Sequence, residues 1–202
     1  MLNPNEPPVW QTTRWFNSPA PLSLAGLNGK VVVAIAFQML CPGCVSHGLP
    51  QGQRIRERFS EDEVAVVGLH TVFEHHAAMT EAALAAFIKE YRWSFPIGID
   101  APNGNGMPQT MKAYELQGTP SLLIFDRKGR LRRHYFGRAD DLMLGAEIMA
   151  LVAEGDQEAA MERKLTSALV MPGHDHHDHH HHHHHHHGEG QGGCGDAGCG
   201  CH

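Results

Sequence analysis

The sequence lacks an apolar run long enough to cross a membrane. No stretch of roughly 18 consecutive apolar residues occurs, so we expect no transmembrane helix. The opening segment, MLNPNEPPVWQTTRWF, has Pro, Asn and Glu where a secretory signal needs a basic start and a continuous apolar stretch. We therefore expect a cytoplasmic protein.

Most of the chain also lacks an excess of charge of either sign. The formal net charge is −6, but residues 172–202 carry four acidic residues and no lysine or arginine, which leaves −2 for the rest. A body so close to neutral gives no basis for binding nucleic acid or an anionic membrane. We expect neither as a partner.

Apolar residues are almost missing from the C-terminal segment, which separates the chain into two parts. Residues 1–171 have a normal apolar content and predict one domain with a Pro-rich N-terminal arm. Residues 172–202 cannot form a core, so we expect a disordered tail. The arm and domain contain Trp10, Trp15 and Trp93, which we interpret as packing residues.

The pattern along residues 1–171 alternates between strands and helices. Apolar and β-branched runs predict strands, which lie at 31–37, 64–69, 95–99, 121–125 and 130–136. Helices are predicted from Cys44 to about Phe59 with an interruption at 48–50, then at 81–91, at 109–116, from Asp140 to a stop at Gly155, and on to about 170. The order β-α-β-α-β-α-β-β-α predicts an α/β thioredoxin fold, with a mixed central sheet flanked by helices.

Three histidines follow the second predicted strand, namely His70, His75 and His76. Together with Glu74 they suggest a metal site or part of a substrate site. Loop histidines are more often polar surface residues, and that is the interpretation we favour.

The five cysteines form two groups, Cys41 with Cys44, and Cys194, Cys199 and Cys201 in the tail. A reducing cytoplasm disfavours structural disulfides, so redox or metal chemistry is expected.

Cys41-Pro-Gly-Cys44 lies between a buried strand and the start of a helix, where unpaired N–H groups favour a thiolate over a thiol. We predict that Cys41 is the nucleophile and that Cys44, one turn later, resolves the mixed disulfide. The alternatives are a zinc half-site, for which no second Cys-X-X-Cys exists, and bystander cysteines.

A second motif, Gly118-Thr119-Pro120-Ser121, comes directly before the predicted hairpin. Proline cannot donate to a β-ladder and is unusual in a central strand. A cis Thr119–Pro120 bond at the start of the strand removes this difficulty, whereas a trans proline entering an edge strand is the alternative.

These two motifs carry a resemblance to a known family. The stretches VVVAIAFQMLCPGCVSHGLP and GTPSLLIFDRKGRLRRHYFG resemble the TlpA/ResA group of thioredoxin-like disulfide reductases, and VAVVGLHTVFEHH resembles its DipZ-like branch. The resemblance covers roughly residues 15–155 and implies that Pro120 faces the two cysteines, with Thr119 and Pro120 shaping the substrate groove. No organic cofactor is implied. The partners implied are a protein or small-molecule disulfide and a thiol electron donor.

His47 stands where this group often has a glutamate that accepts a proton. A histidine near the thiols could move protons at neutral pH, and a solvated surface histidine is the equal alternative. A peroxiredoxin-like peroxidase is a further alternative, but Gln38 occupies the position where such enzymes usually have a threonine.

The tail holds 13 of the 18 histidines and the other three cysteines. Imidazole and thiolate bind nickel, zinc and copper, so we predict that the tail binds several such ions. The alternative is a purification tag, which the interspersed aspartates and the Gly/Cys ending disfavour. The ending CGDAGCGCH resembles the tail of SlyD-type nickel-binding prolyl isomerases. The predicted ligands are His174, His176, His177, His179, His180, His181, His182, His183, His184, His185, His186, His187, Cys194, Cys199, Cys201 and His202.

The sequence therefore predicts a cytoplasmic thiol–disulfide oxidoreductase with a metal-binding tail. A second hypothesis is a metal-handling protein in which the domain keeps metal-binding thiols reduced.

Overall fold

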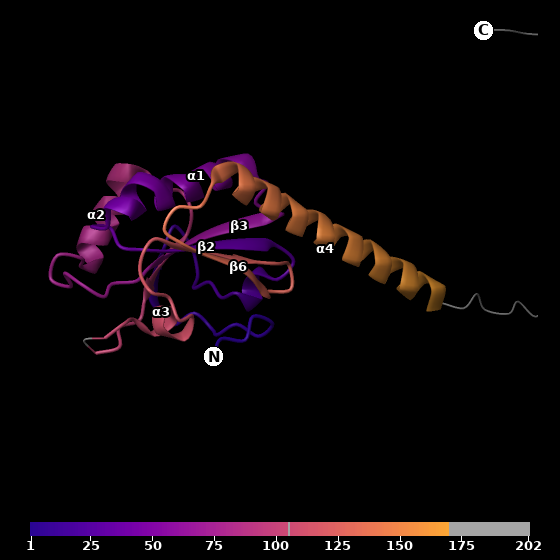
Figure 1. The fold of residues 1–202 in the computed structure, drawn as a ribbon, viewed down its shortest axis with the longest axis horizontal. Helices are drawn as coiled ribbons and strands as arrows, with labels where there is room; N and C mark the ends of the chain where they lie inside the picture. Colours follow the sequence, from indigo (N-terminus) through magenta and orange to yellow (C-terminus); the bar gives the residue numbers. More distant parts are fainter. Residues whose placement is uncertain (105, 170–202) are drawn as a thin grey trace, which may run out of the picture.

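The computed structural model describes residues 1–104 and 106–169 as a six-stranded mixed sheet with helices on both faces (Figure 1). The strands lie in the order β1-β4-β3-β2-β5-β6. Their bounds are β1 (Thr12–Phe16), β2 (Val31–Phe37), β3 (Val64–His70), β4 (Ile97–Asp100), β5 (Ser121–Phe125) and β6 (Leu131–Phe136). The predicted thioredoxin fold is confirmed. The predicted tail, with all of its proposed metal ligands, lies outside the described residues.

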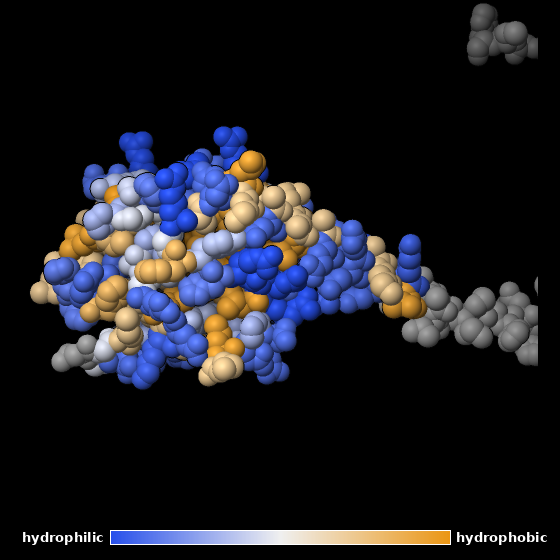
Figure 2. All heavy atoms as spheres, in the orientation of Figure 1, coloured by the Kyte–Doolittle hydropathy of each residue, from blue (hydrophilic) through white to orange (hydrophobic). Residues whose placement is uncertain are grey.

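The helices divide between the two faces of the sheet. They are η1 (Ala25–Leu27), the π-helical segment η2 (Cys44–Gly48), α1 (Leu49–Arg58), α2 (Glu81–Tyr91), α3 (Gln109–Ala113) and α4 (Asp141–Leu169). Buried side chains of α1, α2 and α4 pack on one face, and Met111 of α3 packs on the other with Trp10 of the arm. No described helix combines the length and the apolar character that a membrane span requires. Figure 2 shows mainly hydrophilic side chains on the visible face, with apolar ones in small separate areas.

β2 is the central strand, and every one of its side chains is buried. It pairs parallel with β3, in a register that places Phe37 opposite His70. It pairs antiparallel with β5, in a register that places Ala36 opposite Ser121. An all-apolar, β-branched run suits a strand covered on both faces. The consequence is that the residues after Phe37 and those before Ser121 leave the sheet side by side.

The helix after the second cysteine begins in an unusual way. The predicted interruption at 48–50 is present, because η2 ends at Gly48 and regular α1 turns start at Leu49, with Pro50 in the first turn. Proline is tolerated there because the first turn has no intrahelical partner for its missing N–H.

The prediction that a helix stops at Gly155 is wrong. α4 is one helix of 29 residues, and its C-terminal half projects beyond the sheet (Figure 1). Glycine lowers helix stability by only ~1 kcal/mol relative to alanine, which other contacts can offset. A Cβ built at Gly155 would lie 2.3 Å from Cδ of Arg127, so the glycine gives that side chain room to cross the helix.

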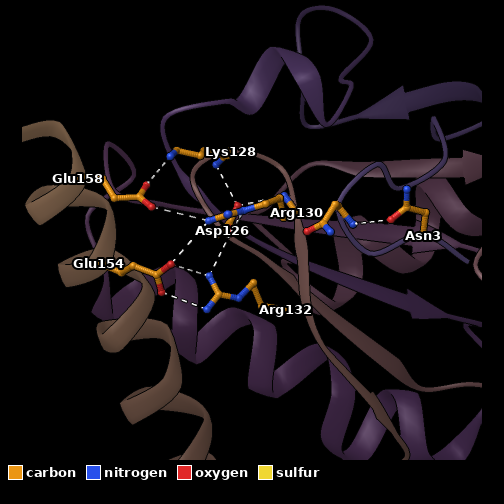
Figure 3. A network of polar contacts seen from close by, with 8 residues as sticks. Asn3, Asp126, Lys128, Arg130, Arg132, Glu154 and Glu158 are labelled. Atoms are coloured by element: carbon orange, nitrogen blue, oxygen red, sulfur yellow. Dashed lines mark hydrogen bonds and ion pairs between the residues drawn. The ribbon is translucent and has the colours of Figure 1, made fainter. Parts of the chain in front are cut away.

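A polar network holds α4 to the β5–β6 hairpin at this point (Figure 3). Asp126 is buried and accepts hydrogen bonds from Nε of Arg130 at 2.7 Å and from Arg132 at 3.1 Å. Arg132 also donates to both carboxylate oxygens of Glu154 on α4, at 2.8 and 3.1 Å. Burial alone would raise the pKa of Asp126, but the hydrogen bonds outweigh burial and lower the pKa. These ion pairs hold the middle of α4 against the hairpin and so offset the loss of helix stability at Gly155.

Candidate active site

Cys41 lies where β2 leads into the helical segment η2. The residue is partly exposed, and its Sγ donates to the carbonyl of Thr119 at 3.4 Å and accepts from the backbone N–H of Cys44 at 3.3 Å. The Cys41 carbonyl accepts the N–H groups of Cys44 and Val45, as at the first turn of a helix. The sequence-based placement of Cys41 at a strand–helix junction is confirmed.

Cys44 has the opposite environment. Both cysteines are free thiols, but Cys44 is fully buried in the core, among residues that include Leu49 and Met39. Burial, together with a hydrogen bond to Cys41, raises the pKa of Cys44 to about 12. The two sulfurs are therefore inequivalent. Cys41 is accessible to a substrate, whereas Cys44 remains a protonated thiol behind it.

Pro120 packs directly on the helix that carries the cysteines. The Thr119–Pro120 bond is cis, as the sequence predicts. A Cβ built at Gly48 would lie 2.8 Å from Cβ of Pro120, and one at Gly43 would lie 3.2 Å from Cδ. Any larger residue at Gly48 would push the proline away. The two predicted motifs therefore meet, with Thr119 and Pro120 against Cys41.

Gln38 fixes the loop that follows β3. It is buried, donates to Glu74 Oε1 at 3.1 Å and accepts from the backbone N–H of Phe73 at 3.2 Å. At the position where a peroxidase would need a threonine hydroxyl, this protein has an amide that is already engaged. The sequence did not predict this role of Gln38, because its two hydrogen-bond partners lie 35 and 36 residues away along the chain.

Two exposed apolar side chains lie beside the two motifs of the site. Leu40 is 54% exposed and immediately precedes Cys41, and Phe136 is 61% exposed at the end of β6. A Cβ built at Gly118 would lie 2.9 Å from the ring of Phe136, which places that ring beside the Thr119–Pro120 turn. The sequence shows that both residues are apolar, but their exposure to solvent is known only from the structure.

His47 is exposed and lines a pocket of about 240 Å³ on the flank of η2. The described contacts include no hydrogen bond between His47 and either cysteine. Its role in proton transfer therefore stays a prediction. The remaining lining residues are Ser46, Gln51, Arg54, Arg138, Ala139 and Asp141.

The prediction that His70 is a polar surface residue is wrong. His70 is the last residue of β3 and is 1% exposed, with its ring 5.2 Å from that of Phe37. Parallel pairing with β2 extends through this position, so the residue belongs to the sheet rather than to the loop. His75 and His76 are exposed, as expected. Across residues 1–104 and 106–169, no group of three or more potential ligands could hold a metal, so the loop metal site is not supported.

Comparison with known proteins places this arrangement in a family. No protein-family model matches the chain, and no curated protein matches it. A solved structure of a thioredoxin-like superfamily protein, SPOA0173, is 58% identical, with 72% of this chain and 94% of that chain covered and a TM-score of 0.71. The chain belongs to the thioredoxin-like thiol–disulfide oxidoreductases.

Two further solved structures are similar to this chain. A thiol–disulfide isomerase from Corynebacterium glutamicum is 48% identical, over 72% of this chain and 96% of that one, with a TM-score of 0.69. StoA from Bacillus subtilis is 21% identical, over 69% and 96% of the two chains, with a TM-score of 0.54, and shows the fold alone. The comparisons do not support the resemblance of the tail to the SlyD-type isomerases.

The buried His70 gives this family member a testable pH dependence. Burial lowers the pKa of His70 to about 4, and its Nε2 has no hydrogen-bond partner. An unfolded histidine has a pKa of about 6.5, so the unfolded state binds the proton more readily between these two values. The free energy of unfolding should therefore fall by about 3 kcal/mol as the pH drops from ~6.5 to ~4. Denaturant titrations across this range should show a shallower pH slope in His70→Phe than in the wild type.

The control is His76→Gln, which changes an exposed histidine and should keep the wild-type slope. An unchanged slope in His70→Phe would show that His70 is not the group responsible.

Proposed function

We propose that Cys41 and Cys44 are the redox pair of this oxidoreductase. The observation that supports the proposal is their asymmetry, with a partly exposed Cys41 whose sulfur faces a backbone N–H and a buried Cys44 thiol. This is the division of roles that a nucleophile and a resolving thiol need. The Thr119–Pro120 turn, which meets Cys41, forms one wall of the site.

The cycle has two exchanges. The Cys41 thiolate attacks one sulfur of a substrate disulfide, forms a mixed disulfide and releases the first substrate thiolate. Cys44 then attacks Sγ of Cys41, forms the Cys41–Cys44 disulfide and releases the second substrate sulfur, which takes up the Cys44 proton. Two electrons have passed from the dithiol to the substrate. A thiol electron donor reduces the pair again.

A protein disulfide is the substrate class that the surroundings of the pair favour. Leu40, next to Cys41, and Phe136, beside Gly118, present apolar side chains to solvent, and such exposed apolar side chains suit contact with a polypeptide. The 48%-identical relative is described as a thiol–disulfide isomerase, which agrees with a substrate of this class.

Replacement of each cysteine by serine tests the assignment. Cys41→Ser should reduce the turnover of a protein disulfide to the uncatalysed background, because the nucleophile is lost. Cys44→Ser should instead accumulate a substrate-linked species at Cys41, which non-reducing electrophoresis and intact-mass measurement detect.

The matched control replaces the tail thiols Cys194, Cys199 and Cys201 by serine, and it should leave turnover intact. Turnover retained in Cys41→Ser would overturn the proposal.

We also propose that the tail binds transition-metal ions. The supporting observation is the sequence itself, with 13 histidines and three cysteines in residues 172–202. Neutral imidazole and thiolate are ligands for nickel, zinc and copper.

Deletion of residues 172–202 tests the metal proposal. The full chain should bind several Ni²⁺ or Zn²⁺ ions in equilibrium dialysis, and a chain that ends at residue 171 should lose this binding. The shortened chain should still turn over a protein disulfide, which shows that it is folded. Equal metal binding by the two chains would contradict the proposal.

A further inference from the structure

The pocket beside His47 lies between the helix of the redox pair and the loop that enters α4. Ser46 and His47 come two and three residues after Cys44, while Arg138 and Ala139 follow Gly137. The backbone N–H of Gly137 donates to the carbonyl of Pro120 at 2.8 Å. One wall of the pocket therefore continues directly into the turn that packs on Cys41, so the pocket borders the redox site.

The carboxylate that lines this pocket is already engaged. Asp141 accepts from Nε2 of Gln51 at 2.6 Å and pairs with Arg54 at 2.9 Å. The neighbouring Asp140 is directed at its own helix, where its Oδ1 accepts the N–H groups of Leu142 and Met143. Each acid therefore already has partners, and none of these partners is the further cation on the pocket wall.

Arg138 is that further cation. It is exposed, and it forms no ion pair within the part of the chain that the structure describes. The hydrogen bond from Gln51 is the main cause that lowers the pKa of Asp141, and the positive charge of Arg138 adds to this effect. Two more groups on the wall, the His47 imidazole and the Arg54 guanidinium, also carry N–H donors. The pocket therefore has a surplus of donors and positive charge.

We propose that this pocket binds a carboxylate carried by the disulfide substrate, with Arg138 as the residue that determines the preference. The inference rests on the proposed redox function of Cys41 and Cys44. A guanidinium recognises a carboxylate through paired, charge-assisted hydrogen bonds. Carboxylates are the anionic groups that polypeptide and small organic disulfides carry. The apolar residues Leu40 and Phe136 cannot supply such a charge preference.

Two matched substrate pairs test the proposal on the full-length reduced protein. The small pair is 3,3′-dithiodipropionate and its neutral diamide. The polypeptide pair is a disulfide-linked peptide with Glu next to cysteine and the same peptide with Gln. The measured quantity is the second-order rate constant for oxidation of the Cys41–Cys44 dithiol, and each acidic substrate is compared with its neutral partner.

The wild type should prefer the acidic member by about tenfold, the size expected of one charge-assisted hydrogen bond. Arg138→Gln should reduce this ratio to about one. The control is Arg163→Gln, which removes the same charge from the exposed, projecting part of α4 and should keep the wild-type ratio. Arg163 lies far along the helix from the pocket, so it reports any effect of net charge alone.

The pattern across the two pairs identifies the source of the carboxylate. A preference within both pairs indicates recognition of the group itself, whereas a preference within only one pair assigns the site to polypeptide or to small disulfides. Equal rates within both pairs, or loss of the preference in Arg163→Gln as well, would overturn the pocket proposal and leave the redox function standing. If no disulfide of either pair oxidises the dithiol, the redox function itself fails.

Discussion

The site depends on one contact, in which Pro120 packs against the helical turns that contain Gly43 and Gly48. Gly48 and Gly43 leave no side chain in the way, so the turn before β5 lies against the helix after β2. That approach brings the Thr119 carbonyl to Cys41 Sγ. The sheet brings these two segments together, because β2 and β5 are neighbouring strands and Ala36 pairs with Ser121. Replacement of either glycine would disturb the site through backbone position rather than through chemistry.

The inequality of the two thiols follows from the same packing. Cys41 immediately precedes the helix, and the N–H of Cys44 points at its sulfur. Cys44 is one turn inside the helix and is covered by the core. Burial favours the neutral form of a thiol, which explains why the pKa of Cys44 is raised to about 12. A single turn of chain thus creates one reactive and one protected sulfur. The order of the proposed exchanges depends on this difference.

The sequence predicted the elements whose pattern is local. The runs 31–37 and 121–125 are continuous apolar segments, and the strands β2 and β5 have these bounds. Thr80 caps α2, whose predicted range of 81–91 is confirmed, since its hydroxyl accepts the N–H of Ala83. The Cys-X-X-Cys and Thr-Pro motifs predicted both sides of the site, because each requires only a short stretch of chain.

The wrong predictions concern residues whose surroundings come from distant parts of the chain. His70 looked like a loop residue, yet pairing with β2 extends the strand through it. Gly155 looked like a helix stop, yet Arg132 and Glu154 tie the helix to the hairpin. No sequence pattern distinguishes Arg138, because its proposed role depends on which nearby carboxylates already have partners. Sequence periodicity records none of these long-range contacts.

The equilibrium reduction potential of the Cys41–Cys44 pair tests the central claim most directly. The measurement uses the full chain with the three tail cysteines replaced by serine, so that only this pair exchanges with a series of thiol–disulfide buffers. The account predicts a reversible two-electron couple between roughly −120 and −290 mV, the range of working disulfide oxidoreductases. If Cys41 and Cys44 never form a disulfide at any potential in that range, the account is contradicted.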